Sequence, residues 1–134
     1  NIFEEITDTI KESSHLIILH HKLIWMYGNN DLEHQIDSIS NGKFGNCFYC
    51  INPNNFYTHI YPKLVEVKQK GVEVICIAGD IGVKVKEFEH ITQEGIHFLA
   101  SGINAGVSNN KALLFIHDIK NKSLRWEYKL ISDL

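Results

Sequence analysis

The chain has 134 residues, of which 44% are hydrophobic, and this is enough to close one core without disulfides or metal staples. Its formal net charge of −3 leaves no basic footprint for nucleic acid. No apolar run reaches the roughly 20 residues of a membrane span, and no secretory signal is visible. We therefore expect one α/β domain over residues 1–134, or the C-terminal portion of a larger domain, with no nucleic-acid partner and no membrane segment.

The first two elements are a helix and a strand. Apolar residues recur at helical spacing over residues 2–11, which predicts an amphipathic helix that ends at Ser13-Ser14. The continuous apolar run from His15 to His20 predicts a strand covered on both faces. Because the chain starts at Asn1, directly before this helix, we expect it to be a piece of a longer protein.

Residues 28–56 are rich in Asn and Gly and show no clear periodicity. A stretch of this length is usually functional or disordered, and its aromatic residues indicate that it packs against the domain. It contains Cys47 and Cys50 in a C-x-x-C arrangement. A redox motif would lie where a strand meets a helix, and a zinc site would need a second ligand pair. We therefore expect ordinary packing cysteines.

A parallel βαβ unit is predicted next. Apolar spacing indicates a helix over residues 56–68, closed by Gly71, with Pro62 marking either its first turn or a kink. The apolar run over residues 72–78 predicts a second buried strand that ends in the loop 79–82. The strand–helix–strand order predicts that the two strands are parallel. If they are also neighbours, their carboxyl ends open onto the same crevice.

The remainder is β-rich and predicts antiparallel C-terminal strands. A strand over residues 96–100 is followed by a glycine-containing turn over residues 101–106. Strands over 112–119 and 124–131 flank a hairpin turn at 121–123. In the last strand apolar and charged residues alternate, which predicts one buried face and one solvated face.

Two strand ends carry the residues of chemical interest. In an open α/β sheet ligands bind beyond the carboxyl ends of the parallel strands, where this chain has His20-His21 and Asp80. Imidazole and carboxylate together suit a transition metal or a general acid–base pair. The alternative is that His20 is a half-buried histidine bonded to a loop and that Asp80 is a turn residue or helix cap.

The remaining histidines have simpler interpretations. We expect three of them on the surface and two in strands, where they would be satisfied core residues; the first group is His34, His59 and His90 and the second is His97 and His117.

The order of these features resembles the C-terminal half of the calcineurin-like metallophosphoesterases. Residues 16–25 are similar to the family's strand that ends in a metal-binding histidine, followed by H-H-P-L-W. Residues 75–82 stand where the family carries G-H-x-H, and 97–105 resemble the following strand and glycine turn. The closing strands with Trp126-Glu127-Tyr128 resemble the hairpin that ends those domains.

The resemblance implies a two-sheet sandwich flanked by helices, and a dinuclear Mn, Fe or Zn centre that hydrolyses phosphate esters. It makes His20 and Asp80 candidate metal ligands, with Asp80 in the place of the first G-H-x-H histidine, and His21 a candidate catalytic residue. Gly82 stands in the place of the second histidine and has no side chain to offer. Lys22 replaces the usual proline and brings a positive charge to the loop.

The family's earlier motifs, D-x-H, G-D-x-x-D and G-N-H-D/E, are absent, so the chain alone cannot assemble a dinuclear site. We expect the C-terminal region of a metal-dependent phosphoesterase that is inactive in isolation, with a substrate that the sequence does not specify. The alternative is a non-catalytic binding or assembly module with a degenerate metal site. Its recognition surface would be residues 28–56, and its open sheet edge would support a homodimer.

Overall fold

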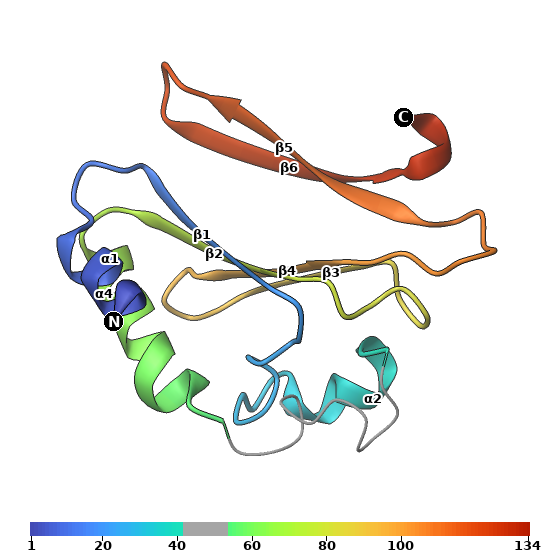
Figure 1. Ribbon diagram of the computed structural model, residues 1–134, viewed down its shortest axis with the longest axis horizontal. Coiled ribbons are helices and arrows are strands. Elements are labelled where there is room, and N and C mark those ends of the chain that lie inside the picture. The colour runs from blue at the N-terminus through green and yellow to red at the C-terminus, as the bar shows by residue number, and fades with distance from the viewer. Residues whose placement is uncertain (42–53) are drawn as a thin grey trace.

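The computed structural model describes residues 1–41 and 54–134. Figure 1 shows a four-stranded sheet with a β-hairpin on one face and helices on the other. The predicted mixture of helices and strands in two sheets is confirmed at this level. Cys47 and Cys50 lie outside the described residues, so the expectation for the C-x-x-C stays a prediction. No helix in the described ranges is long and apolar enough to cross a membrane.

The first helix, α1 (Ile2–Thr9), begins with a capping box. The Asn1 side chain accepts the backbone N–H of Glu4 at 3.0 Å, and the Glu4 carboxylate accepts from the N-terminal ammonium at 3.1 Å. The helix ends at Thr9, short of the predicted residue 11, because Ile10 adopts an extended backbone with φ −61° and ψ 120°.

Strand β1 (His15–His20) lies at an edge of the four-stranded sheet. Its inner neighbour is β2 (Glu73–Ala78), and the two strands run parallel. Ile17 and Leu19 are 41% and 75% exposed, so the predicted cover on both faces is wrong for β1. An apolar run specifies that two faces are apolar, but the packing of other elements decides whether both are covered.

The connection between β1 and β2 contains α4 (Tyr61–Gln69), which is preceded by a π-helical turn at Phe56–Ile60. Pro62 lies in the first turn of α4, where its missing N–H costs nothing, as one of the two sequence alternatives predicted. Leu64 and Val67 are fully buried against the sheet. The predicted parallel βαβ unit is confirmed.

The described parts of the 28–56 segment, residues 28–41 and 54–56, pack against the domain, as the aromatic residues of the segment predicted. They contain the short helical turn Glu33–Gln35 and helix α2 (Ile36–Ile39). Leu32, Ile36 and Phe56 are buried in the main core.

The sheet has the order β1-β2-β4-β3. Strand β4 (His97–Ser101) pairs in parallel with β2, and β3 (Glu87–Ile91) pairs with β4 in the antiparallel direction. Strand β3 is an element that the sequence analysis did not predict. Glu87 and Glu89 lie on one face of this short edge strand. A short segment with these charged residues is interpreted as a loop as long as the neighbouring strand is unknown.

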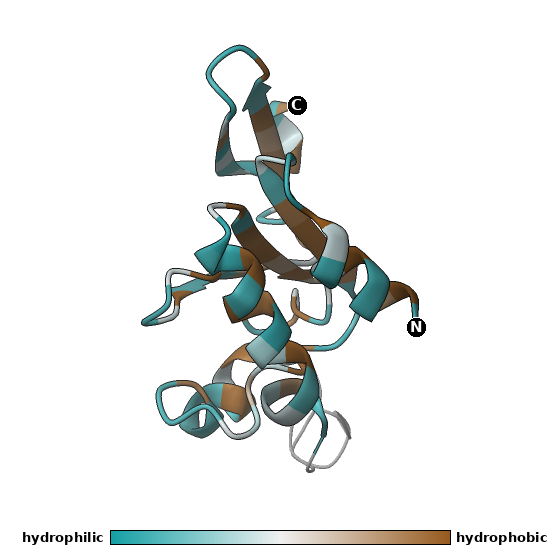
Figure 2. Cartoon of the chain, turned by 90° about the vertical axis from the view of Figure 1, so that its left-hand side faces the viewer, coloured by the Kyte–Doolittle hydropathy of each residue, from teal (hydrophilic) through white to brown (hydrophobic). Residues whose placement is uncertain are grey.

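The C-terminal hairpin of β5 (Lys111–Asp118) and β6 (Ser123–Leu130) covers the other face of the sheet. The Trp126 indole N–H donates to Glu89 at 3.3 Å, and the Tyr128 hydroxyl donates to the Phe88 carbonyl at 2.6 Å. Figure 2 shows the hydrophobic strand residues between the hairpin and the helices. The predicted hairpin is confirmed, and so is the alternation along its last strand, with Trp126 and Tyr128 half-buried and Glu127 exposed.

Candidate functional site

The carboxyl ends of β1 and β2 meet at one end of the sheet. The register pairs His20 with Ala78, and the next backbone bond runs from the Gly79 N–H to the His21 carbonyl at 3.2 Å. The segment His20–Lys22 and the loop 79–82 therefore lie side by side. The prediction that these two strand ends open onto the same region is confirmed.

Asp80 is the buried carboxylate of this region. It is 7% exposed, and its Oδ2 accepts from the Lys22 ammonium at 2.9 Å. Its Oδ1 lies 3.9 Å from Nε2 of His21, whose side chain is 71% exposed. Asp80 thus neutralises the positive charge that Lys22 brings to the loop.

Asn41 holds the loop that carries Asp80. Its backbone N–H donates to the Asp80 carbonyl at 3.0 Å. Its side chain donates to the Ile81 carbonyl at 3.0 Å and accepts the Val83 N–H at 2.8 Å. Three bonds from one residue fix the backbone of the loop, so the position of Asp80 is set by a segment almost 40 residues earlier in the chain.

His20 is held in one tautomer. Its Nδ1 lies 2.5 Å from the Lys22 carbonyl, and because a carbonyl only accepts, the ring proton must be on Nδ1. Its Nε2 is buried with no hydrogen-bond partner among the described residues. The ring packs edge-on against Trp25 with centroids 4.6 Å apart. Burial lowers the pKa of His20, and the bond to the Lys22 carbonyl partly offsets this effect.

This state of His20 is the one that metal-binding histidines adopt. Such residues are neutral, donate one ring N–H to a carbonyl or carboxylate, and keep the other nitrogen free for the metal. The alternative from the sequence, a half-buried histidine bonded to a loop, accounts equally well for the bond between Nδ1 and the Lys22 carbonyl. It does not account for a buried Nε2 that has no partner among the described residues. A buried acceptor without a partner is rare enough to need a reason.

The described residues do not complete a metal centre. Nowhere in residues 1–41 and 54–134 do three or more His, Cys, Asp or Glu side chains lie close enough together to hold a metal ion. Asp80 is already engaged by Lys22, and Gly82 offers no side chain. Asp80 also has no contact with His20 within the described hydrogen bonds and ion pairs.

One cysteine and three further histidines among the described residues lie outside the pair of strand ends. Cys76 is a free, buried thiol on β2, and burial raises its pKa to about 12, so it is unreactive. His34 and His59 are exposed, as predicted. His90 was also expected on the surface, but it is half-buried and its ring stacks on Phe98 at 6.1 Å.

Two further histidine expectations are corrected by the second sheet. His97 is half-buried under Trp126, with ring centroids 4.8 Å apart, and burial lowers its pKa. Its Nδ1 has no partner among the described residues, so it is not a satisfied core residue. His117 is exposed, so it is not a core residue.

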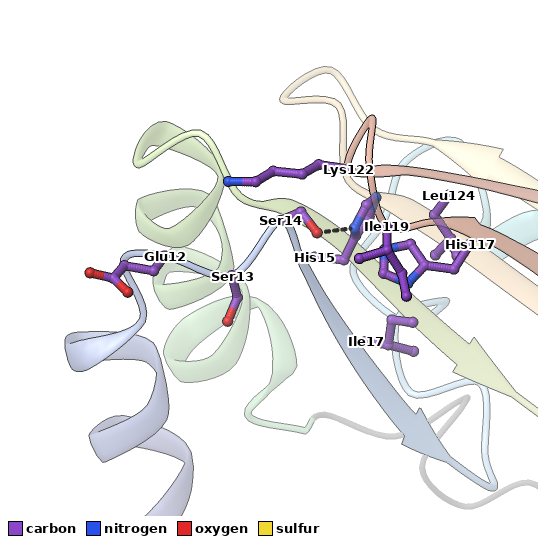
Figure 3. A pocket seen from close by; sticks show the side chains of 9 residues that line it. All are labelled: Glu12, Ser13, Ser14, His15, Ile17, His117, Ile119, Lys122 and Leu124. Atoms are coloured by element: carbon purple, nitrogen blue, oxygen red, sulfur yellow. Dashed lines mark hydrogen bonds between the residues drawn. The ribbon is translucent and has the colours of Figure 1, made fainter.

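A cavity of about 530 Å³ lies at the opposite end of β1 (Figure 3). It is bounded by the segment Glu12–His15, the exposed face of Ile17 and the hairpin turn at Lys122. The His15 and His117 rings meet there edge-on at 5.8 Å. The sequence analysis missed this cavity because these histidines are about 100 positions apart and neither belongs to a motif.

The residues at the carboxyl ends of β1 and β2 are therefore the principal candidate site. They combine a histidine whose buried Nε2 has no partner in residues 1–41 and 54–134, an exposed imidazole and a buried ion pair. Comparison with protein-family models, curated proteins and solved structures finds no match for this chain.

Proposed function

We infer that this chain is the C-terminal region of a metal-dependent phosphoesterase and that His20 is one of its metal ligands. The observation that carries this proposal is the state of His20, with Nδ1 held by the Lys22 carbonyl and Nε2 buried without a partner among the described residues. Its position at the carboxyl end of a parallel strand supports the same interpretation. Manganese, iron or zinc would activate water and polarise the phosphoryl group in such a site.

The chain's own residues have distinct roles in this proposal. Trp25 packs against the His20 ring and fixes its orientation, and the exposed His21 imidazole is available to carry a proton. The remaining ligands would come from a preceding half of a longer polypeptide. Because the described residues do not complete a metal centre, we expect this chain by itself not to hydrolyse a phosphate ester.

The first prediction concerns activity with a chromogenic phosphate monoester or diester in the presence of Mn²⁺. This chain should show no turnover above the metal-only blank. In the longer polypeptide, His20→Ala should lower kcat by about 100-fold or more, because one first-sphere ligand is lost. His34→Ala, which changes an exposed histidine in the helical turn Glu33–Gln35, should leave kcat unchanged.

Two results would contradict the proposal in different ways. Turnover by this chain alone would show that a complete site exists within it. Full activity of His20→Ala in the longer polypeptide would show that His20 is not a ligand.

A non-catalytic assembly module is the second candidate, and the edge position of β1 favours it. The segment from His15 to His20 contains no Asp, Glu, Lys or Arg, and Ile17 and Leu19 are exposed. Natural edge strands are usually protected by charges, prolines or bulges, and β1 has none of these. Two copies of β1 paired antiparallel, Ile17 opposite Ile17, would place His15 of each copy beside Leu19 of the other. Because this register places no like charges opposite each other, we propose that the assembly is a homodimer that forms through β1.

The second prediction tests this dimer with Leu19→Lys. The wild-type chain should be dimeric by light scattering at high concentration, and Leu19→Lys should be monomeric because lysine on an exposed edge opposes strand pairing. The matched control is Ile91→Lys, which changes a residue 54% exposed on β3, the opposite edge of the same sheet, and should remain dimeric. A monomeric wild-type chain, or a dimer that survives Leu19→Lys, would exclude assembly through β1.

A further inference from the structure

The buried carboxylate at the candidate site already has a cation. The Asp80 side chain is 9% exposed, and the Lys22 ammonium lies 2.9 Å from its Oδ2. A buried carboxylate requires a counter-charge or a metal, because the loss of hydration is otherwise uncompensated. Lys22 supplies that charge from within the chain, two residues after the end of β1.

A divalent metal and the Lys22 ammonium would compete for the same carboxylate. A metal bound to Oδ2 would sit within a few ångströms of the ammonium, and two positive groups at this separation repel each other. Nε2 of His21 lies 3.9 Å from the second oxygen, Oδ1, so each carboxylate oxygen of Asp80 has a basic side chain near it. Bidentate binding by a metal would therefore require both side chains to move.

We propose that Lys22 acts as an internal cation at this end of the sheet and excludes divalent metal from Asp80. Asp80 is then a positioning residue that ties the loop 79–82 to β1, and not a metal ligand. The inference rests on the proposed function only in taking the carboxyl ends of β1 and β2 as the functional site. It changes one sequence expectation, because His20 remains a candidate ligand and Asp80 does not.

Metal titration of single-residue variants tests this directly. Mn²⁺ and Zn²⁺ are titrated calorimetrically into the wild-type chain and into Lys22→Met, which keeps the length of the side chain and removes its charge. Lys22→Met should bind one metal ion at least about tenfold more tightly than the wild type, since the competing charge is gone. Adding Asp80→Asn to Lys22→Met should abolish the gain, whereas Asp80→Asn alone should leave the weak metal binding of the wild type unchanged.

Two controls separate charge from other effects. Lys22→Arg keeps the positive charge and should behave as the wild type. Lys111→Met removes a second ammonium, 2.5 Å from Glu87 on the exposed edge of the sheet, and should gain no metal affinity. If Lys22→Met does not fold, Lys22→Gln replaces it, because the glutamine amide still donates to Asp80 without a charge.

The outcomes distinguish this inference from the proposed function. Wild-type binding that Asp80→Asn abolishes would overturn it, and so would a charge-removing variant at Lys22 that gains no affinity. If the longer polypeptide proved not to be a phosphoesterase, the proposed function would fail, but the expected results of the metal titration would not change. Conversely, metal that binds the wild-type chain through His20 alone supports both statements.

Discussion

Replacing Gly102 with alanine is expected to lower the free energy of unfolding by about 3 kcal/mol or more. A Cβ at this position would lie 1.8 Å from the Ile81 carbonyl oxygen and 3.1 Å from that of Gly79. Both atoms belong to backbone, so no side chain can rotate away to relieve the contact. The loop 79–82 would have to move, and Asp80 would move with it. Urea unfolding followed by circular dichroism measures the loss.

The control for Gly102→Ala is Gly106→Ala. Gly106 has φ +78° and nothing within 4 Å of an added Cβ, so alanine there meets only the left-handed backbone penalty of about 1 kcal/mol. Gly102 has no such φ, and its cost is purely steric. Equal losses for the two variants would contradict the close approach between the loop 79–82 and the turn after β4.

Replacing Trp25 with alanine is expected to cost about 3–5 kcal/mol. Trp25 is fully buried, its indole stacks on Phe98 with centroids 5.0 Å apart, and its edge supports the His20 ring. The substitution leaves a cavity between the sheet and the segment that follows β1. Denaturant unfolding gives the energy, and the NMR resonances of His20 report whether its ring loses a single orientation.

Trp25→Phe separates packing from polarity. The indole N–H of Trp25 is buried with no partner among the described residues, and phenylalanine removes this cost while it keeps an aromatic ring on Phe98. We expect Trp25→Phe to stay within about 1.5 kcal/mol of the wild type. A loss as large as that of Trp25→Ala would mean that the indole N–H has a partner that stabilises the fold.

These two substitutions act on the two halves of the same site. Gly102 allows the loop that carries Asp80 to pass close to the end of β4, and Trp25 holds the ring of His20. Neither residue offers a group to a ligand. The site therefore depends on close packing behind it. For this reason we expect these substitutions to lower the free energy of unfolding more than the substitution of any exposed histidine.

Local patterns were sufficient to predict most elements of the fold. The apolar runs before His20 and before Gly79 predicted β1 and β2. For Pro62 the sequence left two alternatives, a first turn or a kink, and the structure places it in the first turn of α4. The hairpin followed from the alternation in its last strand. Strand β3 was missed because five residues with two glutamates and a histidine are typical of a loop, and only the pairing with β4 makes them a strand.

By itself, the sequence determined the parallel direction of β1 and β2 and, provided that the two strands are neighbours, that the segments carrying His20 and Asp80 meet at one end of the sheet. Only the tertiary structure decided that β1 lies at an edge, that Lys22 rather than a free site meets Asp80, and that Nε2 of His20 is left without a partner in the described part of the chain. The physical reason is the distance along the chain over which each property is set. Strand direction follows from the connection between two successive strands of the βαβ unit. Exposure and side-chain partners depend instead on segments that meet only after folding, such as Lys22 and Asp80, which are 58 residues apart.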